Sequence, residues 1–81
     1  MKAYVTVMLK SDVLDPQGAA ISRASASLGY DWVRDVRQGK IFEVEVDAAD
    51  EASARSLIEE LAAKLLANPV IEDFKLEKIE P

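Results

Sequence analysis

The sequence predicts an α+β domain in which two helices are interleaved with four strands. Two observations support this fold class: strand-like alternation of apolar and polar residues recurs along the chain, and two intervening segments have helical spacing. The resulting order is strand, helix, strand, strand, helix, strand. With right-handed crossovers, this order gives a ferredoxin-like βαββαβ plait, a four-stranded antiparallel sheet with both helices on one face. We expect residues 1–81 to form a single domain.

The first strand is predicted over residues 2–10, because apolar and β-branched residues alternate there with a period of two. One face is expected to carry Ala3, Val5, Val7 and Leu9, and the other Tyr4, Thr6 and Met8.

The first helix is predicted to begin after Asp15. A carboxylate oxygen there can accept a hydrogen bond from a free backbone N–H, and Pro16 lacks a donor that would have no partner in the first turn. Gly29 can adopt the left-handed conformation that ends a helix. The apolar residues at helical spacing in between are Ile21, Ala24 and Leu28, and we expect them to face the sheet.

The segment WVRDVRQGKIFEVEV predicts a β-hairpin with its turn at Gly39. Its second strand alternates cleanly, with Phe42, Val44 and Val46 on the core face. The loop length decides which residues of the first strand share that face: an odd loop selects Trp32, Arg34 and Val36, and an even loop selects Asp35 and Arg37. We predict the odd loop, because burying Asp35 costs more than letting one arginine extend to solvent.

A second helix is predicted over residues 47–68, and it has the strongest helical pattern in the chain. Asp47 or Asp50 can cap its start, and Asn68 can close it before Pro69, which cannot continue a helix. Its apolar stripe consists of Ala54, Leu57, Ile58, Leu61 and Leu65. A last strand is predicted from Ile71 to Ile79, with Phe74 and Leu76 facing the core.

Composition excludes several classes of function. The net charge of −5 disfavours nucleic acid and anionic membrane surfaces as partners. The chain has no cysteine and no histidine, so it lacks a thiol nucleophile, a thiolate metal site and the commonest general base. The apolar N-terminal run is too short and too alternating for a signal or membrane segment. We expect a cytoplasmic protein without catalytic, metal or cofactor residues of its own.

The acidic pairs have structural interpretations as well as chemical ones. Asp12 and Asp15 could bind a hard cation, as could Asp47 and Asp50, but each pair precedes a helix and is better explained by capping. A paired-carboxylate site could be formed by Glu43 and Glu45. Without a pocket or a partner of opposite role, these two are better explained as a solvated or partner-facing stripe.

A surface for a protein partner is predicted on the sheet face opposite the helices. That face should be half apolar and includes Ile79 near its end. An exposed apolar patch on so small a chain more often binds a protein partner than has no function. A short chain also has a marginal core and two free strand edges, so we expect a homodimer or homotetramer. The candidate interface residues are Tyr4, Thr6, Met8, Val33, Ile41, Glu43, Asn68, Pro69 and Ile71.

Three stretches carry a family resemblance: VLDPQGAAI, LGYDWVRDVRQGKIFEVEV and LLANPVIEDFKLE. They resemble the PurS family, the small subunit of phosphoribosylformylglycinamidine (FGAM) synthase. The resemblance implies a glutamine-dependent carbon–nitrogen ligase complex in which a glutaminase subunit releases ammonia. A synthetase subunit uses ATP and magnesium to activate formylglycinamide ribonucleotide. The small subunit would carry neither reaction and, as a dimer, would bridge the other two and support ammonia transfer.

A ligand-sensing regulatory domain of the ACT type is the alternative, because it uses the same plait and binds small effectors between paired subunits. It would need a glycine-bearing turn between the first strand and the first helix. Here that turn is SDVLDPQG, in which Gly18 is predicted to lie inside the helix. The assembly subunit is therefore the favoured interpretation.

Overall fold

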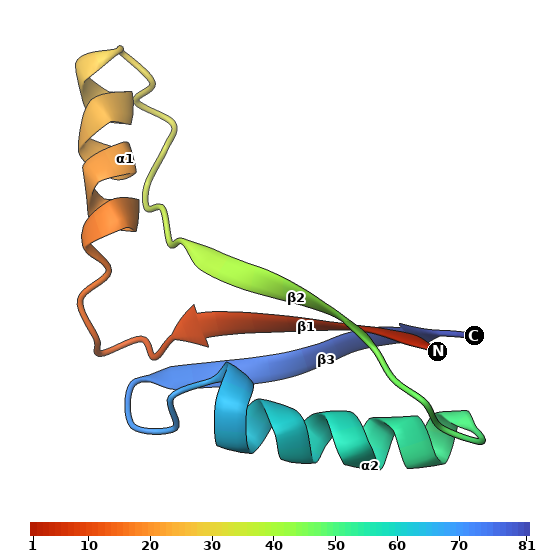
Figure 1. Ribbon diagram of the computed structural model, residues 1–81. Coiled ribbons are helices and arrows are strands. Elements are labelled where there is room, and N and C mark those ends of the chain that lie inside the picture. The colour runs from red at the N-terminus through yellow and green to blue at the C-terminus, as the bar shows by residue number, and fades with distance from the viewer.

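The computed structural model describes residues 1–81 and has an α+β architecture (Figure 1). The three strands form one antiparallel sheet in the order β2-β1-β3, with β1 in the centre. Along the chain the elements are β1 (Lys2–Leu9), α1 (Pro16–Ser27), β2 (Gly39–Glu45), α2 (Glu51–Leu61), the π-helical segment η1 (Ala62–Leu66) and β3 (Glu72–Glu80). Neither the length nor the hydropathy of any helix suits a membrane-spanning segment.

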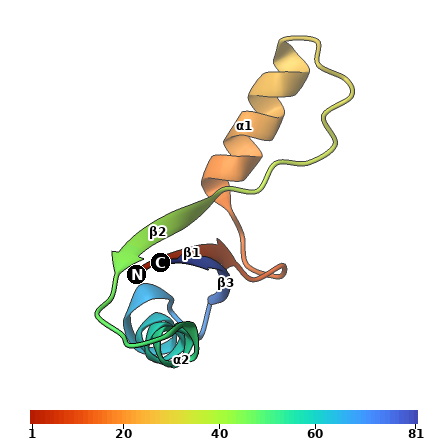
Figure 2. The same ribbon diagram turned by 90° about the vertical axis from the view of Figure 1, so that its right-hand side faces the viewer.

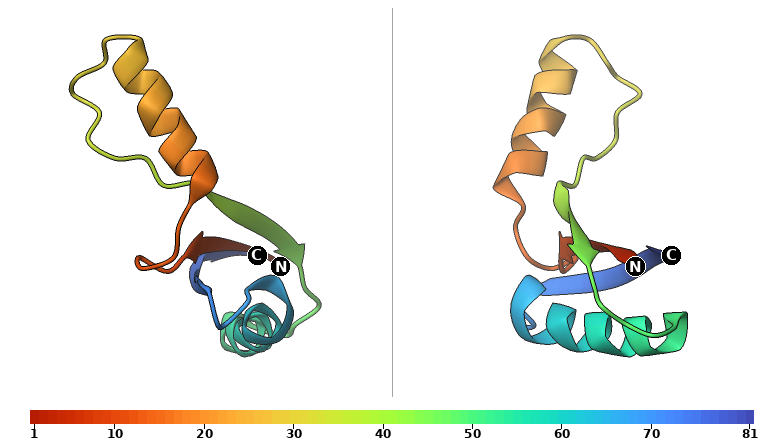
Figure 3. Two further views of the ribbon diagram at one scale, coloured as in Figure 1. Left: turned by 90° about the vertical axis from the view of Figure 1, so that its left-hand side faces the viewer. Right: turned by 45° about the vertical axis from the view of Figure 1, so that its right-hand side comes forward.

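Only one helix covers the sheet. Figures 1 and 2 show α2 lying along one face, whereas α1 stands away from the sheet and α2. The two views of Figure 3 agree that α1 comes near the sheet only at its base, and that the chain returns from its far end to β2. The predicted four-stranded plait with both helices on one face is therefore wrong in two respects: this chain has three strands, and α1 does not pack on the sheet.

The missing strand is the first half of the predicted hairpin. Residues 30–38 return from α1 to β2 without strand structure, and Trp32, predicted to face the core, is 78% exposed. Local hydrogen bonds replace strand pairing here: Val33 N donates to Tyr30 O at 3.1 Å and Val36 N to Asp35 Oδ1 at 2.9 Å. Side-chain acceptors of this kind compete with the ladder of a sheet, so neither predicted loop parity occurs.

Gly39 is not a turn residue, contrary to the prediction. It begins β2 and pairs with Met8, and the one positive φ in the chain belongs to Gly29, at 85°. Gly39 is needed for space, because a Cβ there would overlap Met8 Sδ and lie 2.7 Å from Val7 O. Gly29 follows the end of α1 and has the left-handed conformation that the sequence predicts.

The core lies between the sheet and α2. Its largest fully buried side chains are Val5 and Val7 of β1 and Ile58 of α2, in agreement with the predicted apolar faces. The remaining buried apolar residues are alanines, and the half-buried residues packed around them include Phe42, Val44, Phe74 and Leu76. The small alanine side chains allow α2 to approach the sheet closely.

The apolar stripe of α2 differs from the predicted one because the helix widens. Ala67 N donates to Ala62 O at 3.0 Å, which is the five-residue spacing of a π-turn. The extra residue rotates the next part of the chain, so Leu66 packs against the core and Leu65 is 74% exposed. Leu57 is also exposed, on the flank of α2.

A β-bulge changes which residues of β3 lie on the core face of the sheet. Tyr4 pairs with Lys78 but the next residue, Val5, pairs with Leu76, so Glu77 is an extra residue on β3. This shift returns Ile79 to the core face, where it packs against the buried cluster. Its predicted place on the outer face is wrong.

The isolated chain is extended. Its radius of gyration is 16.0 Å, whereas a compact domain of this length has about 12 Å. Its longest dimension is 51 Å and its shortest 14 Å. Because only 8 of 81 residues are buried, much of the apolar surface is left for contact with another molecule.

Candidate functional site

The outer face of the sheet, opposite α2, brings together five of the nine candidate interface residues. The strand register places Tyr4 beside Glu43 and Thr6 beside Ile41, with Met8 beside Gly39. Ile41 is 60% exposed and Met8 37% exposed, and together they form the apolar part of this face. Tyr4, Thr6 and Glu43 continue it along β1 and β2.

Charged side chains of β3 border this outer face. Lys78 Nζ lies 4.7 Å from the centre of the Tyr4 ring and 2.9 Å from a carboxylate oxygen of Glu80. The hydrogen bond from Lys78 lowers the pKa of Glu80 and, reciprocally, raises the pKa of Lys78. Thr6 Oγ1 donates to Glu77 Oε1 at 3.1 Å. The outer face is therefore charged along β3 and apolar toward β2.

Four candidates lie elsewhere. Val33 is in the irregular return from α1, away from the sheet. Asn68, Pro69 and Ile71 form the connection from η1 to β3, where Val70 N donates to Asn68 Oδ1 at 3.0 Å. The carbonyl of Asn68 also accepts from the backbone of Ile71 and Glu72. This connection is a turn held by its own hydrogen bonds, and it is separate from the outer face.

The most exposed apolar element was not predicted. We call residues 16–36, comprising α1 and the first part of its return, the arm. Its large exposed side chains are Ile21, Leu28, Tyr30 and Trp32. The rings of Tyr30 and Trp32 are 5.7 Å apart, and aromatic residues of this type are enriched where proteins bind each other.

A signal for the arm is present in the sequence. Helix α1 has few large apolar residues, and serines occupy positions 22, 25 and 27. Ser25 Oγ donates to Ile21 O at 2.9 Å, and Ser27 Oγ donates to Arg23 O at 3.2 Å. A helix with so narrow an apolar stripe gains little by packing on a sheet.

The apolar side chains of β2 are only partly covered, because α1 does not pack on the sheet. Phe42 and Val44 are half-buried, and Lys40 Nζ lies 5.7 Å from the centre of the Phe42 ring. β2 and β3 are the edges of the sheet, so each has one unpaired row of backbone N–H and C=O groups.

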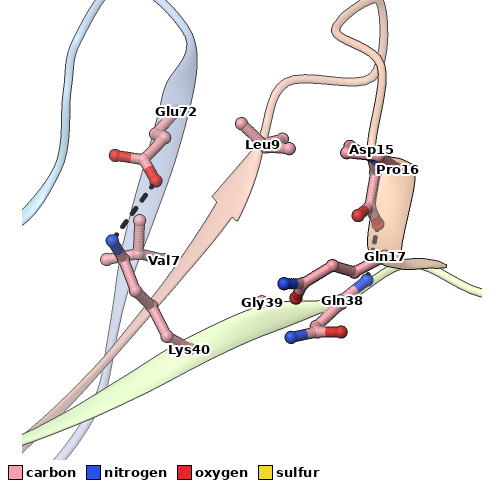
Figure 4. Close-up of a pocket in the computed structure, with 9 residues that line it drawn as sticks. All are labelled: Val7, Leu9, Asp15, Pro16, Gln17, Gln38, Gly39, Lys40 and Glu72. Carbon is pink, nitrogen blue, oxygen red and sulfur yellow. Dashed lines mark hydrogen bonds and ion pairs between the residues drawn. The ribbon is translucent and has the colours of Figure 1, made fainter.

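A pocket of about 290 Å³ lies where the base of the arm meets the sheet (Figure 4). Its charged groups are engaged within the chain: Lys40 Nζ lies 3.6 Å from Glu72 Oε2, and both oxygens of Asp15 accept backbone hydrogen bonds. No cluster of three metal-ligating side chains occurs in the chain. The pocket is lined by Val7, Leu9, Asp15, Pro16, Gln17, Gln38, Gly39, Lys40 and Glu72.

The predicted helix caps are in place. Asp15 Oδ1 accepts from Gly18 N at 3.0 Å, and Asp50 Oδ1 accepts from Ser53 N at 2.8 Å. These backbone donors hold the pKa of each aspartate below its usual value, because they favour the ionised carboxylate. Capping therefore accounts for both residues, and Asp50 rather than Asp47 caps α2.

Comparison with known proteins identifies relatives across the whole chain. Residues 2–80 match the family described as PurS, phosphoribosylformylglycinamidine (FGAM) synthase. The FGAM synthase subunit PurS of Mycobacterium leprae is 47% identical, over 95% of this chain and 94% of that protein.

Solved structures of relatives share the fold. The structure of Bacillus subtilis PurS is 46% identical over 98% of each chain, with a TM-score of 0.82. A chain in the PurLQS structure from Thermotoga maritima is 27% identical, with a TM-score of 0.83 over 98% of this chain and 99% of that one. The resemblance predicted from the three sequence stretches is confirmed, and the chain belongs to the PurS family of phosphoribosylformylglycinamidine synthase subunits.

Proposed function

We propose that this chain is the non-catalytic assembly subunit of its FGAM synthase and joins the glutaminase subunit to the ATP-dependent synthetase subunit in purine biosynthesis. The observation that carries this role is the shape of the chain: an apolar arm and an open sheet face on 81 residues with a small core. Surfaces of this kind are stable in water when another protein covers them. The relative found in the PurLQS structure supports the same role.

The reaction itself belongs to the partners. ATP and magnesium are used by the synthetase subunit, which activates formylglycinamide ribonucleotide, and ammonia comes from the glutaminase subunit. This chain binds no cofactor in the proposal and contributes surface, holding the two active sites so that ammonia passes between them. The complex acts in the cytoplasm.

A second copy of this chain is the first partner in the proposal. Edge strands β2 and β3 each have backbone groups that a neighbouring strand can satisfy, and a two-fold axis would bring the same outer face of two copies together. The arm adds apolar surface that its own sheet does not cover. A homodimer or homotetramer would bury these surfaces before the larger subunits bind.

No observation favours the ACT-type alternative. An effector-binding turn between β1 and α1 would need a glycine outside the helix, and Gly18 lies in the first turn of α1 with its N–H bonded to Asp15.

Reconstitution tests the proposal. The glutaminase and synthetase subunits are assayed for FGAM formation with and without this chain, once with glutamine and once with ammonium chloride as the nitrogen source. We expect the chain to be required for the glutamine-dependent reaction and to matter less when free ammonia is supplied, because only the first reaction needs the two active sites joined. A full glutamine-dependent rate from the two partners alone would show that the bridging role is wrong.

A further inference from the structure

The residues that flank the two ends of the arm, Asp15 and Gln38, meet at the Asp15 carboxylate. Asp15 immediately precedes α1, and its Oδ1 accepts from Gly18 N at 3.0 Å. Its other oxygen, Oδ2, accepts from Gln38 N at 2.7 Å, directly before β2 begins (Figure 4). The residue that caps α1 therefore also ties the beginning of the arm to the end of its return.

Arg37 adds a second connection at the same place. Its Nη2 donates to the carbonyl oxygens of Leu9 and Lys10, the latter at 3.1 Å, where β1 ends. The return segment is thereby joined to the sheet by a side chain as well as by the polypeptide itself. A charged donor shared by two carbonyls is stronger than a neutral one.

Gly18 completes the joint by close packing. It is the one buried residue of α1, and a Cβ there would overlap both the Asp15 carboxylate and Val36 O. The backbone of the first helical turn thus lies against the returning chain with no room for a side chain. We call Asp15, Gly18 and Arg37 the clasp.

Beyond the clasp, few contacts fix the arm relative to the sheet. Its large apolar side chains, including Ile21, Leu28 and Trp32, are exposed rather than packed on the sheet. We infer that the clasp sets the direction of the arm, holding it away from its own sheet and keeping its apolar side chains available to a second copy of the chain. The availability of the arm to a second copy rests on the proposed homo-oligomer, whereas the direction of the arm does not. A group held in its binding orientation before association loses less entropy on binding.

The variant Asp15→Asn removes the clasp hydrogen bond to Gln38 N but keeps the helix cap. Asparagine is as good an N-cap as aspartate, and its oxygen can still accept from Gly18 N. Its amide nitrogen would stand where Asp15 Oδ2 accepts from Gln38 N. An amide N–H cannot accept this hydrogen bond, so the connection between Asp15 and Gln38 is lost. Asp50→Asn is the matched control, because Asp50 caps α2 and bonds only within its own helix. Arg37→Ala is a second test that does not touch a cap.

Distance measurements between nitroxide labels read the direction of the arm. The chain has no cysteine, so Ala26→Cys on the arm and Glu59→Cys on α2 give two defined labels. Dilution with unlabelled protein removes distances between copies. We expect a single narrow distance distribution in the wild type and in Asp50→Asn, and loss of that narrow distribution in Asp15→Asn and Arg37→Ala at unchanged helical circular dichroism. Narrow distributions in both clasp variants would overturn the inference.

Sedimentation of the same variants tests separately whether the clasp promotes self-association and whether the chain self-associates at all. Weaker self-association of Asp15→Asn and Arg37→Ala, with Asp50→Asn unchanged, is the expected result. Unchanged self-association despite a mobile arm would show that the clasp does not serve assembly. A wild type that is monomeric at every concentration would instead remove the proposed homo-oligomer and leave the distance result standing.

Discussion

Replacing Met8 and Ile41 together by lysine tests whether the outer face of the sheet is an assembly surface. The two side chains lie on adjacent strands, and the core is on the opposite face, so the variant should fold. Two lysines would have to lose water of hydration for the same face to be buried in a dimer. We expect weaker association and, with it, weaker docking to the synthetase subunit.

The size of the effect follows from the exposed fractions. Ile41 is 60% exposed and Met8 37% exposed, and burying a whole side chain of this type contributes about 1.5–3 kcal/mol. The exposed portions together therefore amount to about 1.5–3 kcal/mol in each copy. A two-fold axis uses the surface twice, so the dimer should lose at least about 3 kcal/mol, which raises Kd roughly a hundredfold.

Sedimentation velocity over a dilution series measures this change. The matched control is Leu57→Lys with Leu65→Lys, which adds the same two charges at exposed positions of α2 and η1. We expect the control to associate like the wild type and both variants to keep the wild-type circular dichroism. Wild-type association of the Met8 and Ile41 variant, or equal weakening by the control, would refute the assignment of the outer face.

Two further changes have defined outcomes. Gly39→Val should destabilise the fold, because its Cβ would overlap Met8 Sδ and crowd Val7 O. Overpacking costs about 1–3 kcal/mol, which lowers Tm by roughly 4–24 °C for a chain of this size. A thermal melt within a degree of the wild type would contradict this expectation. The pKa of Asp50 is lowered by the Ser53 N–H, so its contribution to stability is complete above the unfolded-state value of 3.8 and is lost as the pH falls below it. Asp50→Asn should remove this part of the acid dependence in denaturant titrations from pH 6 downward, and an unchanged pH profile would show that the cap does not contribute.

The features that the sequence determined by itself are local ones. The cap of α1 by Asp15 and the left-handed Gly29 depend on residues a few positions away, so their chemistry can be read directly. The faces of β1 follow from a period of two, and its buried residues are the predicted ones. The family itself was also readable, because the motif from Leu65 to Asp73 lies in the sequence regardless of how the chain folds.

Tertiary structure decided the features that depend on competition between distant parts of the chain. β1 is already paired on both sides, so a fourth strand formed by residues 32–36 would have to add to the free edge of β2. In the folded chain the backbone N–H groups of Val36 and Gln38 donate instead to the carboxylates of Asp35 and Asp15. The widened turn before Ala67 and the bulge at Glu77 each shift the subsequent residues by one position. Such shifts arise from fitting α2 and β3 around one small core, and no local pattern encodes them. The arm is an intermediate case. The narrow apolar stripe of α1 can be seen in the sequence, but the tertiary structure decides whether so few apolar residues hold a helix on its own sheet.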